Sequence, residues 1–271
     1  MLTSRKGKSY SKLPTFGSSV RILTLARDLR RRKSRERQSL FVVEGVRAVE
    51  ELLKSPLSIQ GVLSGPQLAD APRGQALLET IASSRIEHAV VKEAEFRSAA
   101  ETESPQGVLA IAEMPSRSLD SVPRAGRIRV LVLDALQDPG NVGTILRTAA
   151  ALDVDATVAL PGTVDLWNAK VVRSAMGAHF HHLAFHAKAE DLFAFLETES
   201  IPLWCADSSG NPVDTVSAPD RLALAVGNEG GGLSSSVRER ASKTVSLPIA
   251  STVESLNVAV ATGILLYQLR K

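Results

Sequence analysis

Six short apolar runs in the second half of the chain constrain its fold more than any other feature. In chain order they are RVLVLDAL (129–136), ATVALP (156–161), HLAFH (182–186), PLWCAD (202–207), LALAVG (222–227) and TVSLP (244–248). Strands with near-continuous apolar character are typical of a parallel sheet that is covered on both faces. Helices fit between and after them, at 142–152, 168–176, 189–199, 234–241 and 255–271. The pattern therefore predicts an α/β domain over residues 127–271.

A smaller α/β unit is expected before that domain, over residues 38–113. The sequence predicts a strand, a Glu-Gly turn and a helix at 40–56, strands at 59–65, 87–92 and 106–113, and helices at 73–84 and 93–102. Strands that alternate with helices in this way indicate a compact α/β domain. The segment MPSRSLDSVPRAG (114–126) is rich in Pro, Ser and Gly and has no periodicity, so we expect it to link the two domains.

The remaining composition limits the class of protein. A single cysteine, Cys205, excludes a disulfide framework and favours a reducing compartment, the cytoplasm. No apolar run approaches the length of a transmembrane helix. Aromatic residues make up only 4% of the chain, so aromatic stacking is not expected to dominate any contact with single-stranded nucleic acid.

The positive charge is concentrated at the start of the chain. Residues 1–40 hold 12 Lys and Arg against 2 Asp and Glu, whereas the rest of the chain is acidic on balance. Residues 1–37 are therefore interpreted as a basic arm, with one helix over RDLRRRKSRER (27–37) that carries arginines all round. Contact with RNA would explain such an arm, because each Lys or Arg on a phosphate releases counterions. A solvated tail, or an organellar transit peptide over the acid-free residues 1–21, are the alternatives.

The first of three unusual strand-end turns is DPGNVGTILR (138–147). Ligands of parallel α/β sheets bind at the carboxyl ends of the strands, so such turns are where polar chemistry is expected. This one has neither the Gly-x-Gly-x-x-Gly spacing nor the lysine of a phosphate-binding loop, which argues against a nucleotide-phosphate enzyme. It presents an amide, Asn141, and a cation, Arg147.

The other two turns follow the last two strands. VGNEGGGLSSS (226–236) holds three successive glycines, which let the backbone approach a ligand closely, and a glutamate, Glu229. A buried glutamate needs a cationic partner, and we expect Arg147 to supply it. LPIASTVESLN (247–257) brings Ser255 and Asn257 to the start of the last helix, and its residues 251–254 match a capping box.

Several other residues are interpreted as structural. GAHFHH (177–182), with His186 nearby, has no cysteine or acidic ligand at the spacing of a zinc site, so no metal is predicted. Cys205 lies within an apolar strand and is expected to pack there. Trp167 and Trp204 are expected to be core or interface residues rather than residues on which bases stack.

Taken together and in this order, the three turns closely resemble the signature motifs of a known family. The patterns N-x-G-x-x-x-R, GNEGGGLS and LPIAS-x-x-ESLNVAVATGILLYQ are similar to those of the SpoU (TrmH-type) RNA ribose methyltransferases of the SPOUT superfamily. The resemblance covers nearly the whole second domain. FVVEG (41–45) and the helix after it resemble the start of the L30e-like substrate-binding domain that often precedes the catalytic one.

The resemblance implies a fold, a cofactor and a substrate. The catalytic domain would contain a deep trefoil knot, a rare exception to the rule against knotted chains, and would act as a homodimer. It would use S-adenosyl-L-methionine to methylate a ribose 2′-hydroxyl of RNA, with 23S-type ribosomal RNA expected before transfer RNA. A relative that binds RNA without catalysis is the alternative of another class. The cofactor contacts would come from Asp207, Ser208, Gly227, Asn228, Gly230, Leu247, Pro248 and Leu256.

The same resemblance assigns roles around the reacting hydroxyl. Arg147 is often proposed as the general base in this family, but a guanidinium rarely releases its proton in proteins, so we expect an electrostatic role. Asn141 would orient the ribose or Arg147, and Glu229 would hold the guanidinium. Ser255 and Asn257 would complete the pocket. In the dimer, Arg147 would serve the partner's cofactor site.

Overall fold

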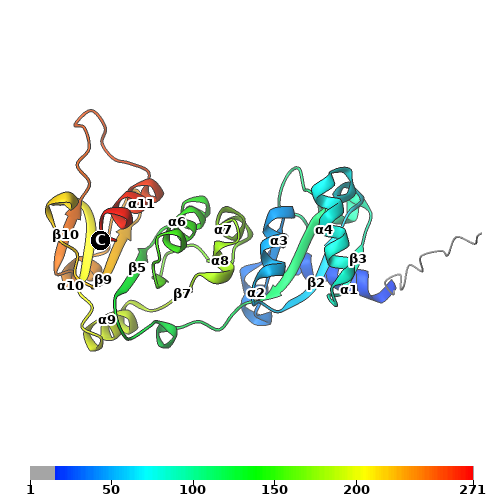
Figure 1. The fold of residues 1–271 in the computed structure, drawn as a ribbon, viewed down its shortest axis with the longest axis horizontal. Coiled ribbons are helices and arrows are strands. Elements are labelled where there is room, and N and C mark those ends of the chain that lie inside the picture. Colours follow the sequence, from blue (N-terminus) through cyan, green and yellow to red (C-terminus); the bar gives the residue numbers. More distant parts are fainter. Residues whose placement is uncertain (1–15, 271) are drawn as a thin grey trace, which may run out of the picture.

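The structure, a computed structural model, describes residues 16–270 and contains two sheets with their own helices (Figure 1). The first domain has strands β1 (Leu40–Glu44), β2 (Ile59–Ser64), β3 (His88–Val90) and β4 (Val108–Glu113), with α3 (Val46–Lys54), η1 (Pro66–Asp70), α4 (Pro72–Ser83) and α5 (Glu93–Ala99). The strand order is β1-β4-β2-β3, in which β4 is antiparallel to β1 and β2. All the strands predicted for this part of the chain are confirmed.

The described part of the predicted basic arm differs from the expectation. Instead of one helix over 27–37 there are two, α1 (Phe16–Asp28) and α2 (Arg32–Gln38). Ile22, Leu23 and Ala26 of α1 are buried against residues of the first sheet and of α5. From Ile22 onward this segment is therefore an integral part of the first domain rather than an arm. The predicted arm residues 1–15 lie outside the described residues.

The second domain contains the predicted parallel sheet. Its strands are β5 (Ile128–Asp134), β6 (Ala156–Ala159), β7 (Ala184–His186), β8 (Leu203–Pro212), β9 (Arg221–Gly227) and β10 (Lys243–Ser246). All neighbouring pairs are parallel, in the order β10-β8-β9-β5-β6-β7, so β9 and β5 lie at the centre. Its helices are α6 (Pro139–Ala151), α7 (Ala169–Ser174), α8 (Ala178–His181), α9 (Ala189–Thr198), α10 (Ser235–Arg240) and α11 (Val258–Gln268). The implied knot stays a prediction.

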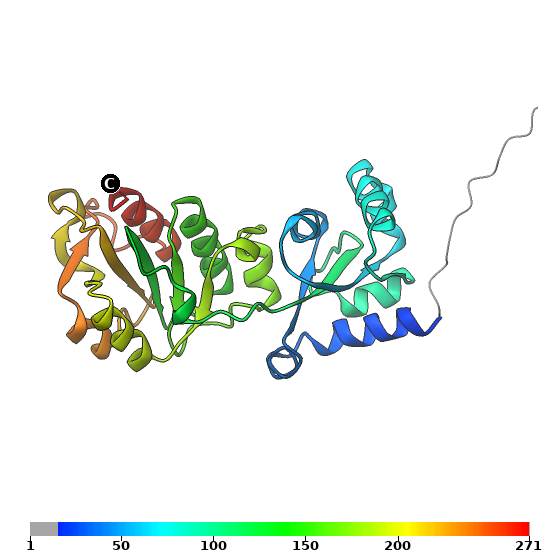
Figure 2. The same cartoon turned by 60° about the horizontal axis from the view of Figure 1, so that its bottom comes forward.

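Burial on both faces explains the near-continuous apolar strands. Leu131 and Leu133 of β5 pack in the cluster that includes residues of α6 and α11, whereas Val130 and Val132 pack with residues of α9 and α10. Figure 2 shows helices on both sides of this sheet. Because side chains alternate between the faces of a strand, a sheet covered twice requires apolar residues at every position.

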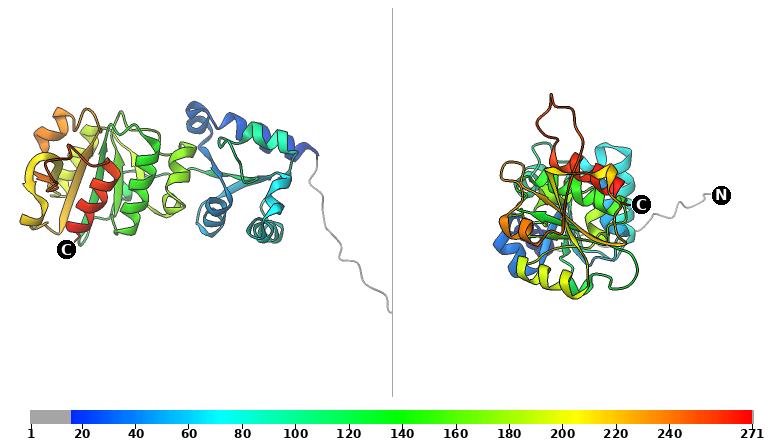
Figure 3. Two further views of the ribbon diagram at one scale, coloured as in Figure 1. Left: turned by 90° about the horizontal axis from the view of Figure 1, so that it is seen from above. Right: turned by 90° about the vertical axis from the view of Figure 1, so that its left-hand side faces the viewer.

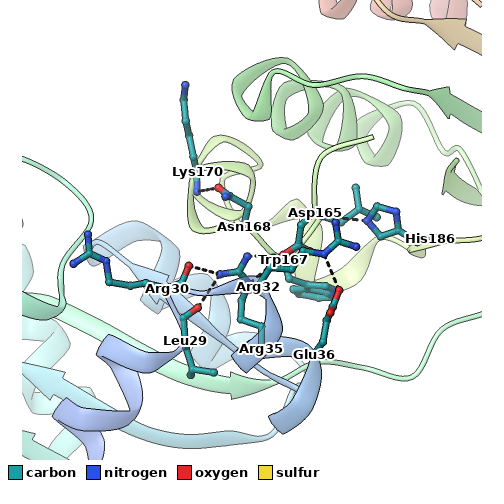
Figure 4. A network of polar contacts seen from close by, with 11 residues as sticks. Leu29, Arg30, Arg32, Arg35, Glu36, Asp165, Trp167, Asn168, Lys170 and His186 are labelled. Atoms are coloured by element: carbon teal, nitrogen blue, oxygen red, sulfur yellow. Dashed lines mark hydrogen bonds and ion pairs between the residues drawn. The ribbon is translucent and has the colours of Figure 1, made fainter. Parts of the chain in front are cut away.

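The two domains lie side by side along the long axis of the molecule and are in direct contact (Figure 3). The ring of Trp167 packs between Phe41 of β1 and His179 of α8, at centroid distances of 4.4 and 4.1 Å. Next to this contact, Arg35 of α2 forms an ion pair of 2.6 Å with Asp165 (Figure 4). Trp167 is thus an interface residue, as expected.

The connecting segment 114–126 also takes part in the contact. It is irregular except for η2 (Leu119–Ser121). The Arg117 guanidinium donates to the carbonyl oxygens of His182, Phe180 and His179, at 2.6, 3.2 and 3.3 Å. Within residues 16–270, no helix has both the length and the apolar character that a membrane crossing requires.

Candidate active site

The first predicted turn places Asn141 at the carboxyl edge of the second sheet. β5 ends at Asp134, and α6 begins at Pro139, whose missing N–H costs nothing at the first helical position. Asp138 caps the helix, because its side chain accepts a hydrogen bond of 2.7 Å from the backbone N–H of Asn141. This cap fixes the first turn of α6, from which the amide of Asn141 projects.

The amide of Asn141 joins the three predicted turns. Its Nδ2 donates to Oε1 of Glu229 at 2.7 Å, and its Oδ1 accepts from Nδ2 of Asn257 at 3.0 Å. The Oδ1 of Asn257 in turn accepts from the backbone N–H of Ala259 at the start of α11. A carboxylate only accepts hydrogen bonds, so this chain of contacts fixes the orientation of both amides. The structure therefore brings together Asn141, Glu229 and Asn257.

Arg147 does not form the expected pair with Glu229. The carboxylate of Glu229 is exposed rather than buried, and its hydrogen bond goes to Asn141. Arg147 lies six residues beyond Asn141, which is roughly 9 Å further along the helix and a third of a turn around it. Over residues 16–270 its guanidinium has no hydrogen bond or ion pair, and it is exposed on α6. Within a single chain, the prediction that Glu229 holds Arg147 is wrong.

Asn228 organises the glycine-rich turn. Its Oδ1 accepts from the backbone N–H groups of Gly230 and Gly231 at 2.9 Å each, and its Nδ2 donates to the carbonyl oxygen of Ala135. Gly227 has no room for a side chain, since an added Cβ would lie 2.4 Å from the backbone of Gly232. The N–H of Gly230, a residue predicted to contact the cofactor, is thus already engaged within the turn.

The third turn is a long loop, residues 247–257, that extends away from the body of the domain (Figures 1 and 3). Ser255 is exposed on this loop. The predicted capping box at 251–254 is wrong. α11 begins later, at Val258, and its cap is Asn257, whose Oδ1 accepts from two backbone N–H groups of the first turn. The donor of the hydrogen bond to Asn141 is therefore the same residue that caps the last helix.

A cavity of about 390 Å³ lies beside the middle of β8 and the carboxyl ends of β9 and β10 and is bounded by the start of α11. This volume is within the range of small-molecule sites. The predicted residues that line it are Asp207, Ser208, Gly227, Asn228, Glu229, Leu247, Ser255, Leu256 and Asn257. Gly230, Pro248, Asn141 and Arg147 do not line it, although Asn141 is bonded to two lining residues.

The lining suits a cofactor that combines an aromatic ring with a positive charge. Leu247, Leu256 and Val226 offer apolar surface, and two acidic residues, Asp207 and Glu254, also line the cavity. Hydrogen bonds from the backbone N–H and hydroxyl of Ser209, with the nearby Arg238, hold the pKa of Asp207 below its usual range. These residues fit S-adenosyl-L-methionine, which carries an adenine and a sulfonium cation.

Some lining residues were not predicted from the sequence. Thr262 and Ala261 of α11, Ser246 of β10 and Glu254 of the loop all border the cavity. Thr262 and Ala261 lie one turn after Asn257, so the helical period from that cap was the signal for them. Ser246 ends a strand and offered no such signal.

Of the residues interpreted as structural, His179, His182, Cys205 and both tryptophans are buried, whereas His181 and His186 are exposed. Over residues 16–270 there is no group of three side chains able to hold a metal ion. Burial lowers the pKa of His179 to about 3 and that of His182 to about 4, and His182 forms a hydrogen bond of 2.7 Å with Thr157. Burial also raises the pKa of Cys205 to about 11, so its thiol stays protonated within β8. Trp204 is buried in the core of the second domain.

Comparison with known sequences supports both domains. Residues 129–267 match the model of the SpoU rRNA Methylase family, and residues 22–110 match the MRM3-like substrate binding domain. The second match starts well before residue 38, in agreement with the packing of α1. The chain is 37% identical over 243 residues to the 23S rRNA (guanosine(2553)-2'-O)-methyltransferase RlmP of Bacillus subtilis. The aligned region covers 89% of this chain and 93% of the relative.

Solved structures agree with the fold. The SpoU methyltransferase AviRb from Streptomyces viridochromogenes, crystallised with AdoMet, has a TM-score of 0.82 at 27% identity and covers 91% of this chain and 96% of its own. The AdoMet-bound rRNA methyltransferase from Sinorhizobium meliloti has a TM-score of 0.78 at 26% identity, with coverage of 94% and 95%. With its α/β fold, its three joined turns and a family match over more than half of its length, the chain belongs to the SpoU rRNA methylase family.

Proposed function

We propose that the protein transfers a methyl group from S-adenosyl-L-methionine to a ribose 2′-hydroxyl of 23S-type ribosomal RNA. The observation that carries the proposal is the Asn141 amide, which joins all three turns at the edge of a cavity suited to the cofactor. The name of the Bacillus subtilis relative, a 23S rRNA 2'-O-methyltransferase that matches nearly end to end, supports the choice of RNA. We place the reaction in the cytoplasm, where ribosomal RNA is accessible.

The chain's own residues position the hydroxyl and manage its charge. The bound cofactor supplies an electrophilic methyl on a sulfonium. Glu229 lines the cavity and uses one oxygen for Asn141, so its other oxygen can accept a hydrogen bond from the ribose 2′-hydroxyl. Asn141 holds that carboxylate in place. Fixing the attacking oxygen in line in this way provides much of the rate acceleration expected for such a transfer.

Arg147 provides the positive charge. Its guanidinium is exposed, and its positive charge and several donors suit it to stabilise a developing alkoxide or to hold an adjacent phosphate. One such donor contributes roughly 3 kcal/mol to the stabilisation of a transition state. Because Arg147 does not line the cavity of its own chain, we assign it to the cavity of a second copy.

The last helix offers the surface for that second copy. Val260, Ile264 and Tyr267 of α11 are exposed by 52, 40 and 49% and lie on one helical face. Exposed apolar residues in such a contiguous row are typical of a protein interface. α11 packs on α6, with Gly263 next to Thr148, so the apolar row adjoins the helix that carries Arg147.

The dimer is tested with the double variant Ile264→Asp/Tyr267→Asp. Two carboxylates in an apolar interface are strongly unfavourable, so sedimentation is expected to report a monomer that has lost methyl transfer. The control is Val90→Asp, which charges a valine with 57% exposure on the edge strand β3. A double variant that sediments like the wild-type dimer would contradict this interface.

The activity is tested by transfer of labelled methyl from S-adenosyl-L-methionine to ribosomal RNA and, in parallel, to transfer RNA. Label in an alkali-resistant dinucleotide is expected, because 2′-O-methylation blocks cleavage at that ribose. Arg147→Ala should lower kcat about 10²- to 10³-fold, while Arg85→Ala, an exposed arginine at the end of α4, should not. Label in transfer RNA alone would favour that substrate, and cofactor binding without transfer to any RNA would favour an inactive RNA-binding relative.

A further inference from the structure

A second cavity, of about 660 Å³, lies where the two domains meet. From the first domain it is lined by the turn between β1 and α3, by the start of α4 and by residues near Gln106. From the second domain it is lined by Arg173 and Met176, at the end of α7. It shares no residue with the cofactor cavity, and nothing described so far uses it.

Arginines from both domains face this cavity. Arg73 is engaged by Glu50 through hydrogen bonds of 2.5 to 3.0 Å. Arg47 is exposed and, over residues 16–270, forms no hydrogen bond and no ion pair within 4 Å. Nη1 of Arg173 is buried and, over the same residues, has no hydrogen-bond partner. One cationic side chain from each domain therefore lines the cavity without an ion-pair partner among the described residues, the exposed Arg47 and the half-buried Arg173.

A further polar atom in the lining also lacks a partner. Oε1 of Gln67 is buried and, like Nη1 of Arg173, has no hydrogen bond to any described residue. Most buried polar atoms in folded proteins are paired, because leaving one unpaired costs free energy. Both atoms are shielded from solvent in this structure, so a donor group in the ligand would satisfy Gln67, and an acceptor would satisfy Arg173, once either side chain turned towards the cavity. The cavity thus calls for a ligand with both kinds of group.

The inner wall combines fixed acceptors with apolar surface. The buried carboxylate of Glu44 accepts from the backbone N–H of Glu101 at 2.8 Å and from the hydroxyl of Thr102. Val46 and Leu68 provide apolar walls. The flat faces of a nucleobase suit such walls, and its amino and imino groups can donate to fixed oxygen acceptors. A phosphate, in contrast, suits the arginines.

The position of the cavity relates it to the active site. Figure 1 shows α3, α7, α6 and α11 in a row along one side of the molecule. α7 packs tightly on α6, where a Cβ at Gly143 would lie 2.5 Å from Ser174. Lys170 of α7 reaches to 3.9 Å from Asp138, the cap of the helix that presents Asn141. A strand of RNA along this row would pass from the second cavity to the reacting centre.

We infer that this interdomain cavity binds an unpaired nucleotide of the substrate RNA, with the base against Glu44 and Gln67 and a phosphate at Arg47 and Arg173. The inference rests on the proposed function, since it takes RNA as the substrate. The two domains together form the site, so it selects RNA in which an unpaired nucleotide lies at a fixed distance from the target ribose.

The test compares the double variant Arg47→Ala/Arg173→Ala with Arg85→Ala, using the full chain and a fragment of 23S ribosomal RNA. The Kd for RNA is expected to rise about thirtyfold in the double variant, since two charge-assisted contacts are lost. The slope of log Kd against log salt should fall by about 0.7, the value for one phosphate of a single strand. The KM for RNA should rise with kcat retained, because these contacts are remote from the reacting atoms. Arg85→Ala, which removes one exposed positive charge just beyond the far end of α4, roughly 18 Å along the helix from the cavity-lining Arg73, should match the wild type.

The outcomes separate this inference from the proposed function. Wild-type Kd, salt slope and KM in the double variant would overturn the inference while leaving methyl transfer intact. If the variant loses RNA affinity but the wild type methylates no ribose, the cavity stands as an RNA site and the proposed function fails. If poly-glutamate binds as tightly as RNA, the inference is overturned in favour of an acidic protein partner. Absence of RNA binding by the wild type would also overturn the inference. Arg47→Ala alone, at an exposed position, controls for misfolding and should still raise the Kd.

Discussion

At the scale of single residues, Asn141 is the side chain that connects the three turns of the site by hydrogen bonds. It accepts from one turn and donates to another, and its own turn is fixed by the cap at Asp138. No other side chain described here bonds to both of the other turns. An asparagine suits this place because its amide offers donors and an acceptor together.

This arrangement makes Asn141→Asp more harmful than Asn141→Ala. The aspartate would place a second carboxylate next to Glu229, and like charges at hydrogen-bond distance repel. We expect Asn141→Ala to lower kcat/KM for methyl transfer about 10²-fold and Asn141→Asp to lower it further, because the attacking group loses its alignment. Steady-state kinetics check this. Thr144→Ala, an exposed threonine one turn further along α6, is the control. Equal activity of Asn141→Ala and the wild type would show that the hydrogen bonds of Asn141 to Glu229 and Asn257 do not align the attacking group.

At the scale of secondary-structure elements, the short helix α8 and strand β6 are coupled through a buried histidine. Burial lowers the pKa of His182 to about 4, and its ring bonds to Thr157 of β6. An unfolded chain binds a proton at this residue near pH 6.5, whereas the folded chain does not until about pH 4. The free energy of unfolding should therefore be highest above pH 6.5 and fall as the pH drops towards 4.

Urea denaturation between pH 4 and 7 tests this pH dependence. His182 alone should remove on the order of 3 kcal/mol by pH 4, because each pH unit across the window is worth about 1.4 kcal/mol. His179, with a pKa of about 3, adds a loss of the same sign. The variant His182→Asn should flatten the dependence, and His181→Ala, at an exposed position of α8, should leave it unchanged. An equally steep dependence in His182→Asn would show that other groups cause it.

At the scale of the whole molecule, one ion pair between the domains is well shielded from water. Arg35 and Asp165 have side chains exposed by only 5 and 15% (Figure 4). The guanidinium of Arg35 also donates to the carbonyl oxygens of Leu29 and Arg30, so it ties the break between α1 and α2 to the second domain. Removing one partner of such a pair leaves a buried charge without compensation.

We expect Arg35→Ala to lower the free energy of unfolding by about 3–5 kcal/mol. Fluorescence of Trp167, at the domain contact, should then change before circular dichroism reports the loss of helices, because the contact opens first. The matched control is Arg37→Ala, which removes an arginine with 73% exposure from the ion pair with Asp28. An exposed pair contributes about 1 kcal/mol or less. If fluorescence and circular dichroism of Arg35→Ala change together, at the same unfolding midpoint as in the wild type, the ion pair does not hold the two domains together.

The sequence was least informative where charge and packing coincide in one segment. Residues 27–37 appear as a run of arginines, yet the apolar residues Ile22, Leu23 and Ala26 just before it anchor α1 in the first domain. Counting charge pointed to an arm, while the period of the apolar residues pointed to a packed helix. Arg35 shows the same effect, because a residue typical of surfaces became buried once Asp165 lay opposite it.

For the candidate site, the sequence predicted where the residues lie but not which of them form hydrogen bonds with one another. Turn chemistry indicated the edge of the sheet where the site lies, because strand-end turns in a parallel sheet meet at one edge. The family resemblance supplied the cofactor-contacting residues. The hydrogen-bond partners within the site could not be predicted in this way. Glu229 bonds to Asn141 and not to Arg147, since Arg147 projects from another side of α6 and further along it.

By itself, the sequence determined the parallel sheet, the order of its helices and the three turns of the site. These depend on local periodicity and on short-range turn chemistry, which any stretch of chain carries with it. Only the tertiary structure decided which side chains bond to one another, that Asn257 and not the 251–254 segment starts α11, and that two domains enclose a second cavity. Such contacts join residues far apart in the chain, so their geometry exists only once the elements have packed.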